Sequence, residues 1–247
     1  MTRPAKESVP PSVDGPGGLF GPALAAARAN FVPAVLLWIF GSAIVASYYL
    51  WPAARPVFAQ VTVWRAEFGL VYPMVSTALF AGLVPYLMQG LQRGGPPQRR
   101  GATVLAYLLI FWALKGIEVE MLYRLQARMF GDSPAAATLA AKTLFDQLVY
   151  IPVWGAPTLV LGMLFAQCGF SLRRMRHHAR AGWYWRLVVP LMIPNWIVWF
   201  PAVVLIYMLP TALQLPMQNI VLCFWVLIVL FLTERQNADT ETTQALP

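Results

Sequence analysis

Charged residues are missing from four long stretches of the chain, which lie at 29–54, 68–92, 147–172 and 187–233. A transmembrane helix needs about 20 apolar residues, so the first three stretches hold one helix each. The last stretch holds two helices, divided near Pro210 and Pro216. A sixth apolar segment starts at Ala102 and continues into charged residues. We therefore expect spans at about 31–51, 69–91, 102–124, 148–167, 186–209 and 214–232.

This pattern predicts an all-α fold, a polytopic transmembrane helical bundle with about six membrane-embedded helices. The proline- and glycine-rich residues 1–28 cannot bury a core, so we expect a disordered N-terminal tail there. Residues 29–68 form an extra N-terminal transmembrane helix and a following loop, 69–233 the main helical membrane domain, and 234–247 a disordered C-terminal tail. Within the loop, residues 52–68 fit a helix in the membrane interface and a solvated loop equally well.

Composition narrows the class of protein further. Of 247 residues, 59% are hydrophobic and 11% charged, whereas soluble domains carry about 25% charged residues. This excludes a soluble domain, a disordered chain and a disulfide-stapled module. The basic residues lie in short loops beside the predicted spans, so the net charge of +8 describes membrane topology and predicts no nucleic-acid partner.

Lysine and arginine in the loops predict the orientation. They concentrate in the N-terminal segment, the loop at 92–101 and the loop at 168–186. Both termini should therefore face the cytoplasm, with these basic loops touching anionic headgroups. The excess of arginine over lysine is typical of a bacterial chain, which favours the bacterial inner membrane; an organelle inner membrane is the alternative.

Six charged residues lie near or within the third and fourth spans. They form three predicted ion pairs on shared helix faces, Lys115 with Glu118, Glu120 with Arg124, and Lys142 with Asp146. Ionised side chains in a membrane usually face the bundle interior or water. The pairs then either hold helices together or line a polar path for solutes, and both interpretations stay open.

Further polar candidates are uncharged, and they are Gln147, Asn195, Gln214 and Asn219. Enzyme signatures are not found: Cys168 and Cys223 lack metal or redox spacing, and His177 and His178 are adjacent in a basic loop. We therefore expect no enzyme, no catalytic residue, no metal and no cofactor.

Several motifs lie in a characteristic order. They are Gly116-x6-Tyr123-Arg124, Lys142-x3-Asp146-Gln147-x4-Pro152, Asn195-Trp196-Ile-Val-Trp199-Phe-Pro201 and Pro210-x8-Asn219-x5-Trp225. Their order and spacing resemble the family of the peroxisomal 22 kDa membrane protein and the mitochondrial inner-membrane protein Mpv-seventeen. Ile117, Glu120 and Leu122 differ from the family pattern, which is typical of a divergent member. The resemblance implies a small helical bundle that forms a weakly selective pore for small solutes.

The functional expectation is an integral membrane channel or pore for small solutes or ions. Its polar core would combine the three charged pairs with the four uncharged candidates. A non-transporting membrane scaffold or stress-response factor is the alternative. Expected partners are the lipid bilayer, small solutes and a second copy of the chain.

Overall fold

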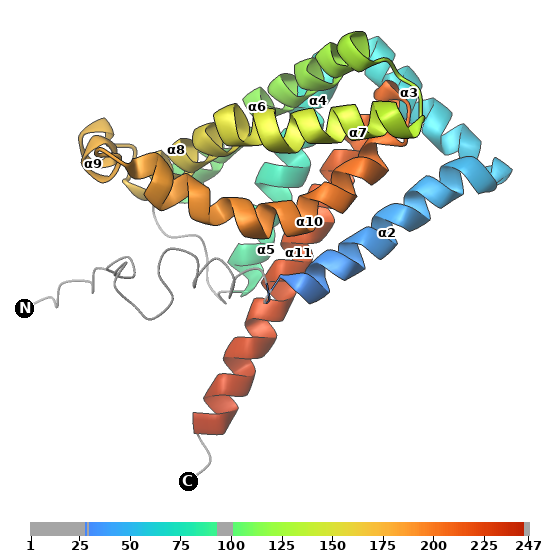
Figure 1. Ribbon diagram of the computed structural model, residues 1–247. Coiled ribbons are helices and arrows are strands. Elements are labelled where there is room, and N and C mark those ends of the chain that lie inside the picture. The colour runs from blue at the N-terminus through green and yellow to red at the C-terminus, as the bar shows by residue number, and fades with distance from the viewer. Residues whose placement is uncertain (1–27, 29, 93–100, 245–247) are drawn as a thin grey trace, which may run out of the picture.

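The computed structural model describes residue 28 and residues 30–92 and 101–244, and every regular element within them is a helix (Figure 1). In chain order the helices are α2 (Phe31–Leu50), η2 (Pro52–Ala54), α3 (Arg55–Phe68), α4 (Val71–Thr77), η3 (Ala78–Leu83), α5 (Val84–Gln92), α6 (Gly101–Phe130), α7 (Ala136–Phe145), η4 (Asp146–Gly155), α8 (Ala156–Gln167), α9 (Leu172–His178), η5 (Tyr184–Val188), α10 (Val189–Tyr207) and α11 (Thr211–Gln244). The disorder predicted for the N-terminal tail lies outside the described residues, apart from Arg28.

Within the part of the chain that the structure describes, five continuous helical stretches are long and apolar enough to cross a membrane, and they are Phe31–Leu50, Val71–Met88, Gly101–Phe130, Ala136–Gln167 and Tyr184–Tyr207. A shorter apolar stretch, Thr211–Leu227, begins α11. Helices suit a bilayer because they satisfy their own backbone hydrogen bonds. The prediction of an all-α transmembrane helical bundle is confirmed, and the chain is an integral membrane protein.

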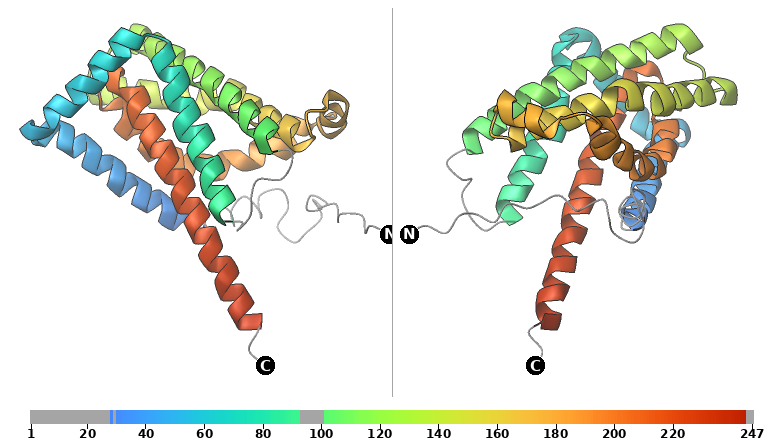
Figure 2. Two further views of the ribbon diagram at one scale, coloured as in Figure 1. Left: turned by 180° about the vertical axis from the view of Figure 1, so that it is seen from behind. Right: turned by 60° about the vertical axis from the view of Figure 1, so that its left-hand side comes forward.

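The helices pack around α11, which contacts α2, α3, α4, α5, α6, η3 and α10 (Figures 1 and 2). On one side α6 packs against α4 and η3, and on the other α10 packs against α2, α7 and η4. The apolar core lies between α2, α10 and α11, where Leu37, Ile206 and Leu215 are almost fully buried. The Trp38 indole donates a 2.9 Å hydrogen bond to the carbonyl oxygen of Val198, which ties α2 to α10.

Three turns meet at one end of the bundle. Tyr49 Oη, at the end of α2, donates a 2.5 Å hydrogen bond to the Met208 carbonyl. Thr211, the first residue of α11, donates its backbone N–H and hydroxyl to Asp132 in the α6–α7 turn. We call this the Asp132 end, and the opposite end, where the basic helix α9 lies, the α9 end (Figure 1).

The structure decides one segment that the sequence left open and differs from the prediction in another. Residues 52–68, for which a loop and a helix were equally open, contain the helix α3 (Arg55–Phe68). The last span was expected to end at 232 and to be followed by an unstructured tail, whereas α11 runs on to Gln244. The residues that follow the apolar run, 233–244, contain no proline or glycine that would end the helix, and they begin with the good helix formers Glu234, Arg235 and Gln236 after Thr233.

Three spans contain segments of wider helical turn, η3, η4 and η5. In a π-helix each N–H bonds to the carbonyl five residues back, which adds a residue per turn and frequently marks functional sites. Within η4 the ring of Pro152 removes an N–H. Because the turn of η4 is wider than an α-helical one, residues on its two sides face directions that a regular α-helix would not give them.

Candidate functional site: a cavity between the spans with polar residues in an apolar lining

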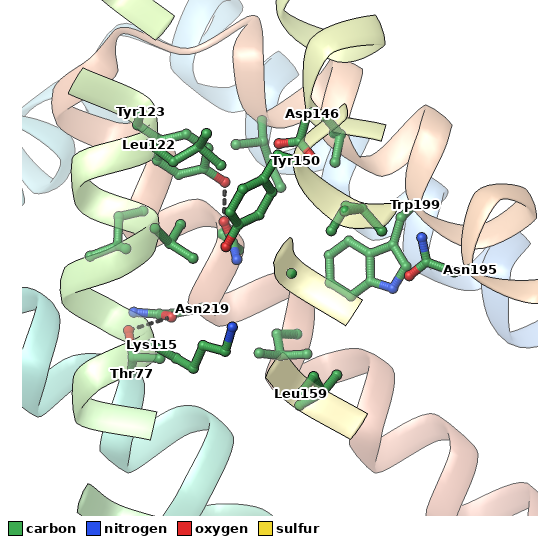
Figure 3. Close-up of a pocket in the computed structure, with 18 of the residues that line it drawn as sticks. Thr77, Lys115, Leu122, Tyr123, Asp146, Tyr150, Leu159, Asn195, Trp199 and Asn219 are labelled. Carbon is green, nitrogen blue, oxygen red and sulfur yellow. Dashed lines mark hydrogen bonds between the residues drawn. The ribbon is translucent and has the colours of Figure 1, made fainter. Parts of the chain in front are cut away.

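A cavity of about 330 Å³ lies between α6, η4, α8, α10 and α11 (Figure 3). Small-molecule sites have volumes of about 300–1,000 Å³, so one compact solute fits. Most of the lining is apolar and includes Trp112, Trp199 and Trp225. The polar lining residues are Thr77, Lys115, Tyr123, Asp146, Gln147, Tyr150, Asn195, Gln218 and Asn219.

Asp146 is the single carboxyl among the lining residues and is 5% exposed. Its oxygens accept hydrogen bonds from Tyr207 Oη at 2.6 Å and from Gln147 Nε2 at 3.0 Å. Within the described part of the chain, no basic side chain lies at ion-pair distance from this carboxyl. Neutral donors alone hold Asp146 in place.

Lys115 lines the same cavity from α6, and its charge is compensated locally. Its Nζ lies 2.8 Å from Glu118 Oε1 and donates to Thr158 Oγ1 at 2.6 Å. Tyr150 Oη donates a short hydrogen bond to Glu118 Oε1, the carboxylate oxygen that Lys115 also approaches. Lys115 and Glu118 thus form the predicted pair, and the pair joins α6 to η4 and α8.

Amide side chains of α11 complete the polar lining. Asn219 is 2% exposed; it accepts from Thr77 Oγ1 at 3.1 Å and donates to Ser76 Oγ at 3.0 Å. Gln218 accepts a short hydrogen bond from Tyr123 Oη. These contacts fix α11 against α4 and α6.

The wide turn of η4 is stabilised by side chains from the neighbouring span. In this wide turn each carbonyl would accept from the N–H five residues later. For the Gln147 carbonyl that residue is Pro152, and for the Pro152 carbonyl it is Pro157, and neither proline has an N–H to donate. Trp196 Nε1 donates to the Gln147 carbonyl at 2.9 Å, and Tyr184 Oη donates to the Pro152 carbonyl at 3.0 Å.

Asn195 adds a third contact between the two spans, this time to a side chain, because its Nδ2 donates to Gln147 Oε1 at 3.3 Å. The two most specific motifs of the sequence, around Gln147 and around Trp196, are therefore hydrogen-bonded to each other. Trp199 and Pro201 continue the second motif on α10, where Trp199 faces the cavity (Figure 3).

Glu120 forms the predicted pair with Arg124, at 2.6 Å between Arg124 Nε and Glu120 Oε1. A second arginine that the sequence did not indicate also binds Glu120: Arg65 of α3 donates from Nη2, and from Nε at 3.2 Å. The Glu120 side chain is fully buried, whereas that of Arg124 is 46% exposed. This cluster anchors α3 to α6 and lies away from the cavity.

The predicted ion pair between Lys142 and Asp146 is wrong. Lys142 Nζ lies 3.4 Å from Asp132 Oδ1 and 5.7 Å from the centre of the Tyr207 ring. The turn between the two residues is an ordinary α-helical one, since the Asp146 N–H still bonds to the Lys142 carbonyl. The side chains separate because each has other partners: Asp132 binds Lys142, whereas Tyr207 and Gln147 bind Asp146. Lys142 consequently points toward the Asp132 end and Asp146 toward the cavity.

Between Asp146 and the Asp132 end the bundle interior is closed but polar. Tyr123, Gln126 and Tyr207 are each at most 2% exposed, and the rings of Tyr123 and Tyr207 lie 5.5 Å apart. Among the described residues, neither amide atom of Gln126 has a hydrogen-bond partner, and neither does the hydroxyl of Thr143. Buried polar groups normally have partners, so water entering this region would gain hydrogen bonds.

Asp132 closes the end of this polar segment. It binds Thr211 N at 3.1 and 3.2 Å and Thr211 Oγ1 at 2.7 Å, and so caps α11. Burial alone would raise the pKa of the Asp132 carboxyl, but the hydrogen bonds from Thr211 and the charge of Lys142 outweigh it and lower the pKa below its ordinary value.

The ten predicted polar residues divide into two groups. Those that line the cavity are Lys115, Asp146, Gln147, Asn195 and Asn219, and those that lie away from it are Glu118, Glu120, Arg124, Lys142 and Gln214. Gln214 is fully buried and donates to the Leu209 carbonyl at 2.9 Å, beside Pro210 at the start of α11. Gly116 lets α6 approach α4 closely, and Trp225 lines the cavity.

Sequence reasoning missed Tyr150, Tyr207 and Asp132 as site residues. Tyr150 lies four residues after Asp146, but the wide turn makes that spacing uninformative. Within the described residues, no group of three His, Cys, Asp or Glu lies close enough to hold a metal ion. Comparison with family models, with curated proteins and with solved structures finds no match to this chain.

Proposed function

We propose that this integral membrane protein is a passive path for small solutes, closed at its Asp132 end. The observation that carries the proposal is the cavity into which Lys115, Asp146 and Asn219 face from three different spans. Polar side chains in a membrane interior are costly and usually face a solute or ion path.

The proposed path continues from the cavity toward the Asp132 end. Beyond Asp146 it meets Tyr207 and Lys142, and then Asp132 at the turn before α7. The unpartnered amide of Gln126 lies in the same region. In this proposal the Lys142–Asp132 contact and the Asp132–Thr211 cap form a gate, and water fills the region when the gate opens.

We place the α9 end in the cytoplasm of a bacterial cell, with the inner membrane as the location. Arg173, Arg174 and Arg176 lie on α9, and basic residues accumulate on the cytoplasmic side. There they would contact anionic headgroups. With the shorter stretch Thr211–Leu227 counted as a sixth span, both termini would lie on that side.

We also propose a distant relationship to the family of the peroxisomal 22 kDa membrane protein and Mpv-seventeen. Support comes from the contact between the two most specific motif segments, where Trp196 and Asn195 both bind Gln147. Residues that hydrogen-bond to each other would be retained together.

The test is solute flux into liposomes that contain the purified full-length protein, measured by stopped-flow light scattering with urea and glycerol. Asp146→Asn should change the flux, whereas Glu67→Gln, which removes a carboxylate from exposed α3, should leave it unchanged. Asp132→Asn should raise the flux because it loosens the gate. Flux equal to that of protein-free liposomes would remove the pore proposal.

A second candidate, a non-transporting scaffold, is favoured by the ion pairs that join helices. Arg65 and Arg124 both bind Glu120, and Lys115 binds Glu118, so these charges already have structural partners. For a scaffold, Asp146→Asn should lower the thermal stability in detergent while no solute flux exists to be changed.

A further inference from the structure

We propose that the cavity binds an organic ammonium ion, with the cationic head beside Asp146 and the apolar part among the tryptophans. This inference rests on the proposed solute path and names the class of solute that the path selects. It follows from the distribution of charge, of aromatic rings and of free hydrogen-bond acceptors around the cavity.

The charge around the cavity is unbalanced in favour of a cation. Lys115 is neutralised by Glu118 at 2.8 Å, with Thr158 as a further acceptor. Lys142, one helical turn before Asp146, is engaged by Asp132 at 3.4 Å. Asp146 therefore remains as the one carboxyl among the described lining residues, held only by the neutral donors Tyr207 and Gln147.

The Asp146 carboxyl keeps acceptor capacity for a ligand. Each of its oxygens accepts one hydrogen bond from the protein, whereas a carboxylate offers about four acceptor sites. In Figure 3 Asp146 lies at one side of the cavity, and Tyr150 and Trp199 line the same cavity. A cation at this position would meet both the carboxyl and the aromatic rings.

The aromatic rings of the cavity would bind both parts of such a ligand, the cationic head and the apolar group. Ring faces attract cations, by about 2 kcal/mol or more where water is excluded, and Tyr123, Tyr150 and Trp199 line the cavity around Asp146. Trp112 and Trp225 lie further toward the α9 end on α6 and α11. An apolar group attached to the cationic head would pack against these two indoles.

An anion fits this cavity poorly. It would meet the Asp146 carboxyl without a described base beside it, and it would have to displace Glu118 to reach the charge of Lys115. Burying an unpaired charge is costly, so the same geometry that favours a cation disfavours an anion.

The test is equilibrium binding of radiolabelled choline to the purified full-length protein in detergent. The competitors are unlabelled choline and its uncharged isostere, in which carbon replaces the quaternary nitrogen. We expect the isostere to bind about tenfold more weakly or worse, because it lacks the charge. This comparison needs no variant, so it holds even if a variant misfolds.

Two variants locate the site. Asp146→Asn and Trp199→Leu should each weaken choline binding by about tenfold, and the matched control Glu67→Gln should bind like the wild type. Equal affinity for choline and its isostere, no choline binding, or full binding by Asp146→Asn would overturn the inference. Flux of urea or glycerol in liposomes would then still support the solute path, and its absence would overturn the path as well.

Discussion

The indole Nε1 of Trp196 donates a 2.9 Å hydrogen bond to the carbonyl oxygen of Gln147, five residues before Pro152. That carbonyl has no helical donor, because the ring of Pro152 occupies the position of the N–H in this wide turn. A side chain of α10 thus completes the backbone of η4. The bond holds together two of the spans that enclose the cavity.

Replacing this indole should destabilise the protein more when Pro152 is present than when it is absent. Trp196→Phe removes the donor, and we expect a loss of about 1 kcal/mol, the scale of hydrogen bonds in membrane bundles. In a Pro152→Ala background the restored N–H can reach the Gln147 carbonyl, so the same substitution should cost less. A double-mutant cycle of unfolding free energies in detergent measures this difference, and a strictly additive cycle would contradict it.

The Glu120 cluster predicts an ordered series of stabilities. Glu120→Gln leaves Arg65 without its buried partner, and breaking a buried ion pair costs about 3–5 kcal/mol. Arg124→Gln should cost about 1 kcal/mol or less, because the Arg124 side chain is 46% exposed. Thermal unfolding of both variants in detergent gives the order, and an equal loss would show that burial of the cluster does not matter.

Asp132 predicts a dependence of stability on pH. Its pKa in the folded chain is lower than the ordinary value of 3.8, so near that pH the unfolded chain binds more protons than the folded one. The stability that the carboxylate contributes is therefore present above pH 3.8 and is lost as the pH falls through the lower folded pKa.

The variant Asp132→Asn should accordingly be less stable than the wild type at neutral pH and equal to it at strongly acidic pH. Thr211→Val removes the hydroxyl donor and keeps the backbone N–H, so it should show a smaller difference of the same sign. Unfolding midpoints measured in detergent across this pH range provide the check. A constant gap between Asp132→Asn and the wild type would refute the linkage.

Gly116 and Gly82 form a matched pair for helix packing. A Cβ at Gly116 would overlap the carbonyl oxygen of Pro73 and lie 2.8 Å from Thr77 Oγ1. Gly116→Ala should therefore destabilise the protein by about 1–3 kcal/mol, the scale of overpacking. A Cβ at Gly82 meets neighbours at 3.4 Å, so Gly82→Ala should be tolerated. Melting temperatures in detergent distinguish the two, and equal values would show that α6 and α4 can separate freely.

The sequence predicted the spans because their signal is local. Each depends on about 20 consecutive apolar residues, and no knowledge of the partner helix is needed. The pairs of Lys115 with Glu118 and of Glu120 with Arg124 were predictable for the same reason, since both lie within the regular turns of α6. These are the parts of the site that a helical period determines.

The remaining contacts join residues that are far apart in the sequence, and the spacing along one helix says nothing about them. Arg65 binds Glu120 across 55 residues of sequence, and Asp132 engages Lys142 and Thr211 through a turn. The predicted pair of Lys142 with Asp146 failed because partners from other segments bind both side chains, Asp132 in one case and Tyr207 in the other. Long-range packing was invisible in the spacing of residues.

Each wide turn carries one residue more than the α-helix around it, and this surplus has a consequence for mutational studies. Deleting one residue within η4 would remove this surplus and let the chain relax into ordinary turns, so the parts of the span on the two sides would keep about their present facing. Deleting one residue in the regular turns of α8 has no surplus to absorb it and would rotate the two sides by about 100° relative to each other. Single-residue deletions should therefore be tolerated better within Asp146–Gly155 than within Ala156–Gln167.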